Sequence, residues 1–352
     1  MRFLRNAWQL VREAASEWSN DKAPRLGAAL SYYTIFSLAP VLLMTIAVAG
    51  LVLGPQAAEG HIVTQLAGLL GADAAKAIQT LLEKANHKSS GILATVVGSV
   101  TLIVGATGVL IELQDALNTV WKVVTKPGRG IKGILRDRML SFGIVLGFGF
   151  LLLVSLVLSA AVALLDSWIG ALIPGWVVVG YLLSYGISLG LVAFVLAAIF
   201  KILPDAKIAW RDVWVGALVT SLLFHAGKFG ISIYIGKAGV ASAFGAAGSL
   251  AVLLVWIYYS SQIVLFGAEF TRVYANRYGT HVVPSDNAIQ VPETPLARAE
   301  MEKRIKQGDV AGAVAVSAGS GARRCARPPC RARRRQPAPR RRAPSRPAES
   351  PR

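Results

Sequence analysis

The sequence is short of charged residues. Only 16% of its 352 residues are Asp, Glu, Lys or Arg, whereas soluble domains contain about 25%. Hydrophobic residues make up 54% of the chain. The shortage of charge argues against a water-soluble protein and indicates that lipid is the main solvent.

Cysteine and histidine are scarce too. The two cysteines, Cys325 and Cys330, lie together near the C-terminal end, so no disulfide can hold a core together. The four histidines are far apart in the chain: His61, His87, His225 and His281. Structural zinc sites need several Cys or His ligands close together, so we expect neither a metal site nor another cofactor.

The first 25 residues lack the apolar run of a cleavable signal peptide, because eight of their side chains are charged. Apolar residues instead recur there at helical spacing: Leu4, Trp8, Val11, Ala15 and Trp18. This pattern predicts a cytoplasmic amphipathic helix within residues 1–25 that lies on the membrane surface. The alternative is a leader helix packed on the loops.

Long uncharged runs follow. Residues 26–53 contain no charged side chain, and about 20 apolar residues are enough for a helix to cross the hydrocarbon layer. Five more apolar runs give six predicted spans: 26–53, 92–111, 140–165, 176–202, 214–235 and 246–268. We therefore predict an all-α polytopic protein, in which residues 26–280 form a six-helix transmembrane bundle.

Lys and Arg gather in alternate connections between these spans. They are frequent in the N-terminal arm and in residues 112–139 and 203–213, and rare or balanced by acids in residues 54–91, 166–175 and 236–245. Cytoplasmic loops are the ones enriched in Lys and Arg, so both termini are expected in the cytoplasm. On the opposite side, residues 62–85 predict two short amphipathic helices over the mouth of the bundle.

The composition changes after the last span. Residues 281–352 predict a cytoplasmic linker, a short helix over 294–307 with Pro295 in its first turn, and an Arg/Pro-rich tail. From Gly319 on, apolar residues are too few to offset the entropy of ordering, so the tail is expected to be disordered. Its arginines could contact anionic lipid or RNA without specificity, but a solvated tail is the better expectation, so no specific nucleic acid is predicted as a partner.

Polar side chains fall at one depth in three spans. The candidates in the cytoplasmic halves of the first, second and sixth spans are Ser31, Tyr33, Thr34, Ser37, Glu112, Tyr258, Gln262 and Glu269. Polar groups that face lipid are costly, so these side chains are expected to turn inward and line a cytoplasm-facing cavity. Interhelical hydrogen bonds that only hold the helices together explain the pattern equally well.

Two ionisable residues, His225 and Lys228, lie inside the fifth predicted span. Lys228 falls in its outer half, where it could attract an anionic head group or simply extend toward the membrane surface. For His225, a hydrogen-bonded packing role is the better expectation than a proton relay. Small residues at Ala94/Gly98, Thr101/Gly105 and Gly143/Gly147 predict close helix contacts.

Five segments together resemble the YihY / virulence factor BrkB family of bacterial inner-membrane proteins. They are Ala28–Pro40, Leu203-Pro204-Asp205, Gly245–Leu250, Trp256–Gln262 and Gly267–Phe270. The resemblance implies a six-helix protein of the bacterial inner membrane. Members have been called ribonuclease BN, linked to serum resistance and proposed as transporters, including transporters of lipids.

The nuclease name does not suit this sequence. The zinc ribonuclease of that name uses a His-x-His-x-Asp-His site, and the four scattered histidines cannot supply one. We expect a non-enzymatic transporter or lipid-translocating protein, with membrane lipids as partners, a lipid or small molecule as substrate, and room for homo-oligomers. The alternative is a membrane scaffold or envelope-associated virulence factor that acts through its loops.

Overall fold

The computed structural model describes residues 2–54, 108–126, 176–238, 248–292 and 294–325, with scattered positions between 56 and 82 and at 143 and 147. Most of the predicted second span and nearly all of the third, 140–165, therefore lie outside the described residues. The same holds for much of the segment 62–85 and for the tail beyond Cys325.

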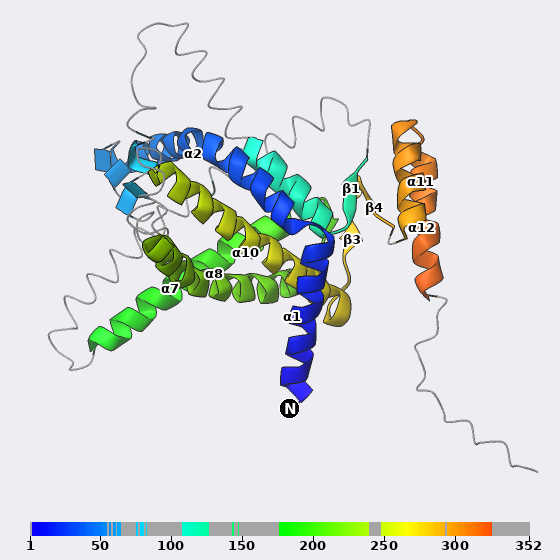
Figure 1. Cartoon of the computed structure of the whole chain (residues 1–352), viewed down its shortest axis with the longest axis horizontal. Helices are drawn as coiled ribbons and strands as arrows, with labels where there is room; N and C mark the ends of the chain where they lie inside the picture. The colour runs from blue at the N-terminus through cyan, green and yellow to red at the C-terminus, as the bar shows by residue number, and fades with distance from the viewer. Residues whose placement is uncertain are drawn as a thin grey trace, which may run out of the picture. The chain divides into compact units, whose positions relative to one another are not determined.

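The described chain is mainly helical (Figure 1). Its first and longest helices are α1 (Arg2–Asn20), α2 (Ala23–Leu53), α7 (Trp176–Ile202), α8 (Trp210–Ala238) and α10 (Gly248–Tyr278). Residues 108–120 form a further helix, which we call the 108–120 helix. Within the described residues, three helical segments are long and apolar enough to cross a membrane: Tyr185–Ile202, Trp210–Ile231 and Leu250–Tyr278.

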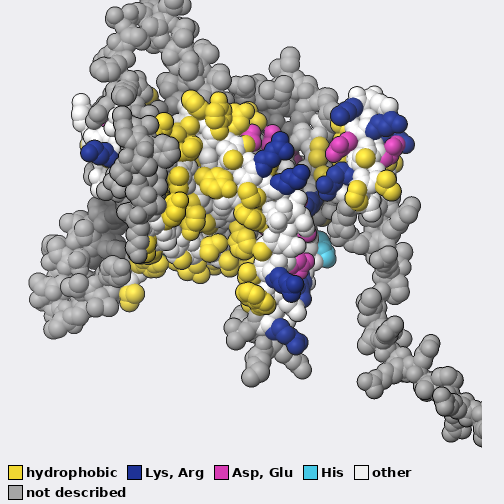
Figure 2. Space-filling view, viewed as in Figure 1, with side chains coloured by type: hydrophobic (Ala, Val, Ile, Leu, Met, Phe, Trp, Pro, Cys, Tyr) yellow, Lys and Arg dark blue, Asp and Glu magenta, His cyan; other side chains and the backbone are white. Residues whose placement is uncertain are grey.

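Hydrophobic side chains cover much of the surface of these long helices, while Lys and Arg side chains follow α1 (Figure 2). Phe36 of α2, Leu182 of α7 and Phe229 of α8 are each more than 60% exposed. Apolar surface of this extent would be unfavourable in water. It is what a helix bundle presents to lipid, so the surface agrees with the composition.

The long helices contact one another in sequence: α7 packs on α8, α8 on α10 and α10 on α2. The largest buried cluster joins the 108–120 helix to α7, α8 and α10 around Trp121, Phe200 and Leu265. α1 is held against α10 by a separate cluster, in which Leu10 and Ala14 meet Phe270. The apolar stripe of α1 is therefore at least partly covered by protein, although Trp8 is 68% exposed.

α10 continues well beyond residue 268, where the predicted sixth span ended, and reaches Tyr278. The extension carries Glu269 and Arg272, which pair with each other, and Arg272 also pairs with Glu17 of α1. Partners supplied by α1 stabilise a polar stretch of helix that apolar length alone does not predict.

Two small antiparallel sheets, which an all-α prediction leaves out, close one end of the bundle. β1 (Val123–Thr125) pairs with β4 (Ala288–Gln290), and β2 (Ala206–Lys207) pairs with β3 (Val283–Pro284). The chain after α10 thus returns to the segments that follow the 108–120 helix and α7. For this reason residues 281–291 belong to the first compact unit, Met1–Val291, rather than to a linker.

The second compact unit, Pro292–Arg352, contains α11 (Pro295–Lys306) and α12 (Val310–Cys325). α11 coincides with the helix predicted over 294–307. α12 was not predicted, and it continues past Gly319, where disorder was expected to begin. Arg304 pairs with Glu300 at 2.9 Å and with Asp309 at 3.2 Å, across the turn that joins the two helices.

Candidate functional site

The amide of Gln262, on α10, lies against the backbone of α2 at Gly27. A Cβ atom added at Gly27 would collide with the Gln262 side chain. Only glycine lets the amide approach this closely, since any other residue would place a side chain in the same space. We call this contact the α2–α10 seam.

The Gln262 amide is buried in the seam without partners. Within the described part of the chain, neither its Nε2 nor its Oε1 makes a hydrogen bond. A buried polar group left without a partner costs about 1–3 kcal/mol. The closed seam therefore holds a group that would gain free energy from contact with water or with a polar ligand.

A set of charged residues lies two helical turns further along α10. We call Glu17, Asp21, Lys122, Glu269 and Arg272 the ionic cluster. Arg272 donates from Nη2 to Glu269 at 2.9 Å and to Glu17 of α1 at 2.6 Å. Lys122, just after the 108–120 helix, pairs with Asp21 and lies 3.6 Å from Glu17. The cluster connects α10, α1 with the turn after it, and the segment after the 108–120 helix.

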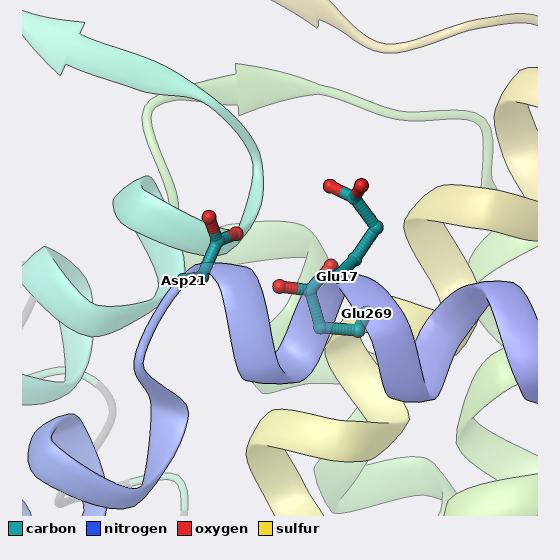
Figure 3. A group of neighbouring side chains, drawn as sticks. All are labelled: Glu17, Asp21 and Glu269. Carbon is teal, nitrogen blue, oxygen red and sulfur yellow. The ribbon is translucent and has the colours of Figure 1, made fainter.

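Three carboxylates of this cluster approach one another from α1, from the turn after it and from α10 (Figure 3). One carboxylate oxygen from each of Glu17, Asp21 and Glu269 lies within 4.8 Å of the others. Lys122 and Arg272 already bind these carboxylates. Since both cations are already paired with these carboxylates, the arrangement is a salt-bridge network more than an open metal site.

The network sets the charge of Glu17. Burial alone would raise the pKa of Glu17, but the hydrogen bond and the positive charge of Arg272, together with Lys122, outweigh it and hold the pKa below its usual value. Glu17 is therefore ionised at neutral pH. Its charge helps to fix α1 on α10.

The serine hydroxyls of the first span, which were predicted to line a cavity, are hydrogen-bonded to carbonyls of α2 itself. Ser31 donates to the Gly27 carbonyl at 2.7 Å, and Ser37 donates to the Tyr33 carbonyl at 2.8 Å. Thr34 is half-buried, and its carbonyl accepts a weaker bond from Ser37 at 3.2 Å. These bonds lie within one helix, so Ser31 and Ser37 do not extend the seam.

Tyr33, Glu112 and Tyr258 lie around the seam rather than in it. Tyr33 is 44% exposed and packs near Gly108, at the start of the 108–120 helix. Glu112 is half-buried one turn further along that helix, and burial, with the charge of Asp115, raises its pKa. Tyr258 is 38% exposed, so the structure does not bring it to the buried face that Gln262 and Glu269 share.

His225 and Lys228 lie on α8, away from the seam. Nδ1 of His225 is 2.9 Å from the Ser221 carbonyl, and its Nε2 is 3.5 Å from the Ser188 hydroxyl of α7. Tyr185 and Phe224 pack against its ring. His225 is thus a hydrogen-bonded packing residue in this structure. Lys228 lines a crevice between α8 and α10.

Asp205, in the Leu203-Pro204-Asp205 motif, organises the bundle end that carries the sheets. Its Oδ2 accepts hydrogen bonds from Thr125 at 2.8 Å and from Asn118 at 3.2 Å, and its backbone N–H donates to Asn118 at 2.8 Å. These bonds connect the segment after α7 to the 108–120 helix and to β1. The motif therefore has a structural role at this end.

Sequence reasoning missed most of the ionic cluster. Glu269 is a candidate there, but Glu17, Asp21 and Lys122 enter only as charges of the N-terminal arm and of a loop, and Arg272 is not singled out. The available signal was the spacing of Glu269 and Arg272, since residues three apart face each other on a helix. The partners on α1 and at Lys122 become visible only in the folded chain.

Comparison with known proteins places the chain among membrane proteins. The Virulence factor BrkB family model matches residues 14–289. Relatives include UPF0761 membrane proteins of Ralstonia nicotianae, 28% identical over 74% of this chain and 57% of the relative, and of Pseudomonas paraeruginosa, 28% identical over 74% and 61%. This chain thus spans less than two thirds of the length of these relatives, and no solved structure matches it. The family match covers most of the chain, which therefore belongs to the Virulence factor BrkB family of membrane proteins.

Proposed function

We propose that this chain is a transporter or lipid-translocating protein of the bacterial inner membrane, and that its polar path follows the α2–α10 seam. In this proposal six helices span the membrane and both termini lie in the cytoplasm. No chemical step is assigned to any residue. The observation that carries the proposal is the buried Gln262 amide, which has no partner within the described residues.

The amide supports the proposal because it raises the free energy of the closed seam. In a static helix contact, an apolar side chain of similar shape would fill the space at no polar cost. In a seam that opens, water or the polar part of a substrate forms hydrogen bonds with the amide, so glutamine lowers the free energy of the open state. Gly27 lets the two helices close again without a side chain between them.

The ionic cluster lies on the same face of α10 as Gln262, and its ion pairs fix α10 to α1 at one end of the seam. Glu269 is fully buried, and Arg272 joins it to Glu17 of α1. Breaking a buried ion pair by removing one partner costs about 3–5 kcal/mol. We infer that the cluster anchors α10 to α1 while the helices beyond it move at the seam.

A phospholipid translocation assay tests this function. Full-length protein is reconstituted into phosphatidylcholine and phosphatidylglycerol vesicles that contain a trace of fluorescent phospholipid, and dithionite bleaches the label exposed outside. With the wild type, dithionite should bleach more label than the outer leaflet holds, because labelled lipid moves out from the inner leaflet. Gln262→Leu should slow this additional bleaching about tenfold or more.

Ser261→Ala is the matched control, because Ser261 is the neighbouring residue and its hydroxyl bonds within α10 to the Ile257 carbonyl at 2.9 Å. This variant should translocate lipid like the wild type. Equal bleaching in protein-containing and empty vesicles would overturn the proposal for lipids, and unchanged translocation by Gln262→Leu would overturn the seam as the path.

A further inference from the structure

Two buried carboxylate oxygens of the ionic cluster lack a hydrogen-bond donor. The Asp21 side chain is 8% exposed, and Glu269 is fully buried. Lys122 donates to Oδ1 of Asp21, and Arg272 donates to Oε2 of Glu269. The other oxygen of each group, Oδ2 of Asp21 and Oε1 of Glu269, makes no hydrogen bond to any residue that the structure describes. Buried polar atoms are normally hydrogen-bonded, so a donor is missing at both oxygens.

The two carboxyl groups lie close together. Figure 3 shows the Glu269 carboxylate directed toward those of Asp21 and Glu17, and one oxygen from each lies within 4.8 Å of the others. The Asp21 carboxyl group is within hydrogen-bonding range of Glu269. Ionised carboxylates only accept hydrogen bonds, so these two groups can bond to each other only if one of them carries a proton. A single O–H group between them would give both oxygens a partner.

The charges of the cluster also call for one proton. Three carboxylates, those of Glu17, Asp21 and Glu269, meet two cations, Lys122 and Arg272. With every group ionised, the cluster therefore carries one negative charge in excess. Like charges that share a buried site repel strongly, so one carboxyl group retains its proton. One bound proton makes the cluster neutral.

Other charged residues near the pair do not provide the missing positive charge. Lys22 and Arg25, where α1 meets α2, are exposed. Arg277, further along α10, is already paired with Glu13 of α1. Asp212 of α8 accepts hydrogen bonds from the chain after α10. The compensating charge must therefore come from solution.

A proton suits this site better than a metal ion. A metal ion would place a further positive charge beside Lys122 and Arg272, and hard cations such as Ca²⁺ need six or more oxygen ligands. A proton needs only the two oxygens that have no donor. Glu17 is the exposed member of the cluster, at 32%, so water reaches the pair there and exchanges the proton with it.

We propose that Asp21 and Glu269 together bind one proton at neutral pH, and that loss of this proton loosens the turn between α1 and α2 from α10. In the loosened state both carboxyl groups meet water and ionise. The attached state thus binds one proton more, and the attachment weakens as the pH rises. The proton controls the anchor that the proposed function assigns to the cluster, and only this link to the seam rests on that function.

Infrared spectroscopy detects the proton directly. The C=O stretch of a protonated carboxyl group absorbs apart from the bands of carboxylates, and ordinary Asp and Glu are ionised at about pH 7. Full-length wild type should show this band at that pH. Glu269→Gln and Asp21→Asn should each lose it, because the remaining carboxyl group then ionises beside a neutral amide. Asp286→Asn is the control and should keep it, since Asp286 is exposed and pairs with Lys207 outside the cluster.

A wild-type spectrum without the band would overturn the proposal. So would a band that persists in Asp21→Asn, because Glu269 would then hold the proton without its partner. Neither spectrum depends on translocation, so the proton site and the transport function can fail separately.

Fluorescence anisotropy tests the loosening. A dye is attached to Ser19→Cys, an exposed position in the last turn of α1, in a protein whose Cys325 and Cys330 are replaced by serine. The anisotropy should fall as the pH rises from about 6 to about 9. Glu269→Gln, whose amide replaces the protonated acid, should abolish this fall, and Asp21→Asn provides a second test if the first variant folds poorly. An unchanged fall in both variants, or a fall that depends on Na⁺ in place of choline, would overturn the proposal.

Discussion

Single polar residues inside these helices are of two kinds. The hydroxyls of Ser31, Thr220 and Thr271 each donate to the carbonyl one turn earlier in their own helix, at 2.7 Å. They cost little in an apolar surrounding, because the helix itself supplies the acceptor. The Gln262 amide has two N–H donors and an acceptor oxygen, which are too far from their own backbone to bond in this way. Among the residues that the structure describes, none of them has a partner in the seam. The difference explains why Gln262, and not the serines, is assigned to the path.

The unpaired amide predicts a conflict between stability and function. Gln262→Leu removes the polar atoms and keeps a side chain of similar size, so the free energy of unfolding should rise by about 1 kcal/mol. The same change should slow lipid translocation, because the open seam loses its polar group. Thermal unfolding in detergent measures the first effect, with Ser261→Ala as control. A fall in stability would show that the amide has partners in the folded protein.

At the scale of helices, α8 and α10 cross through two reciprocal contacts. Gly216 of α8 faces Thr271 of α10, and Gly267 of α10 faces Thr220 of α8. A Cβ atom added at either glycine would collide with the opposite threonine. Since lipid tails are as apolar as the helices, close packing of this kind is what holds two membrane helices together.

This crossing predicts large effects from small substitutions. Gly216→Ala and Gly267→Ala should each destabilise the protein by about 1–3 kcal/mol, through overpacking between two rigid helices. Thr220→Ala should recover part of the loss in Gly267→Ala, because it removes the nearest atoms. Gly186→Ala on α7 is the matched control, since a Cβ there meets nothing within 4 Å. If Gly216→Ala and Gly267→Ala both stayed within about 0.5 kcal/mol of the wild type, as ordinary surface changes do, the result would contradict the crossing.

The attachment of α1 to α10 should depend on pH. The pKa of Glu17 is lowered in the folded protein, so its ionised form stabilises the attachment above the ordinary carboxyl pKa. This contribution is lost as the pH falls through the lowered value. Acidification from pH 6 to below about 4 should therefore loosen α1.

Fluorescence anisotropy measures this release. A dye is attached to Ser16→Cys on α1, in a protein whose Cys325 and Cys330 are replaced by serine. The anisotropy should fall on acidification in this protein. Glu17→Gln should already show lower anisotropy at pH 7 and a weaker pH dependence. Identical titrations of the two proteins would exclude Glu17 as the controlling group.

Across the whole molecule, the sequence predicts what depends on local composition. The apolar length of α2, α7, α8 and α10 and the amphipathic spacing of α1 are readable from residues close together in the chain. The pairing of β1 with β4 and the ion pairs of Arg272 with Glu17 join residues far apart. The contacts of Gly216 and Gly267 also join residues far apart in the chain. The small-residue pairs predicted from the sequence lie in other segments, because only the folded structure shows which glycine contacts a side chain.

The division into two units predicts that one truncation of the chain preserves the stability of the first unit and that a shorter one lowers it. Ending the chain after Val291 removes only the second unit, so the thermal unfolding temperature of the membrane unit should stay within a few degrees of the full chain. Ending it after Thr280 also removes β3 and β4, together with the hydrogen bonds that the Ser285 N–H donates to the Asp205 carbonyl and the Val291 N–H donates to the Lys122 carbonyl. This shorter chain should unfold at a clearly lower temperature. Equal unfolding temperatures would show that the two small sheets contribute nothing.

Locking the seam tests the central claim most directly. Gly27→Cys and Gln262→Cys are combined in a protein whose Cys325 and Cys330 are replaced by serine, so that a disulfide would join α2 to α10 where the Gln262 side chain meets Gly27. Oxidation should stop the residual phospholipid translocation of the double variant in vesicles, and reduction should return it to the level of Gln262→Cys alone, while each single cysteine variant responds to neither treatment. Undiminished translocation by the fully cross-linked protein would show that α2 and α10 need not separate, and would contradict the path.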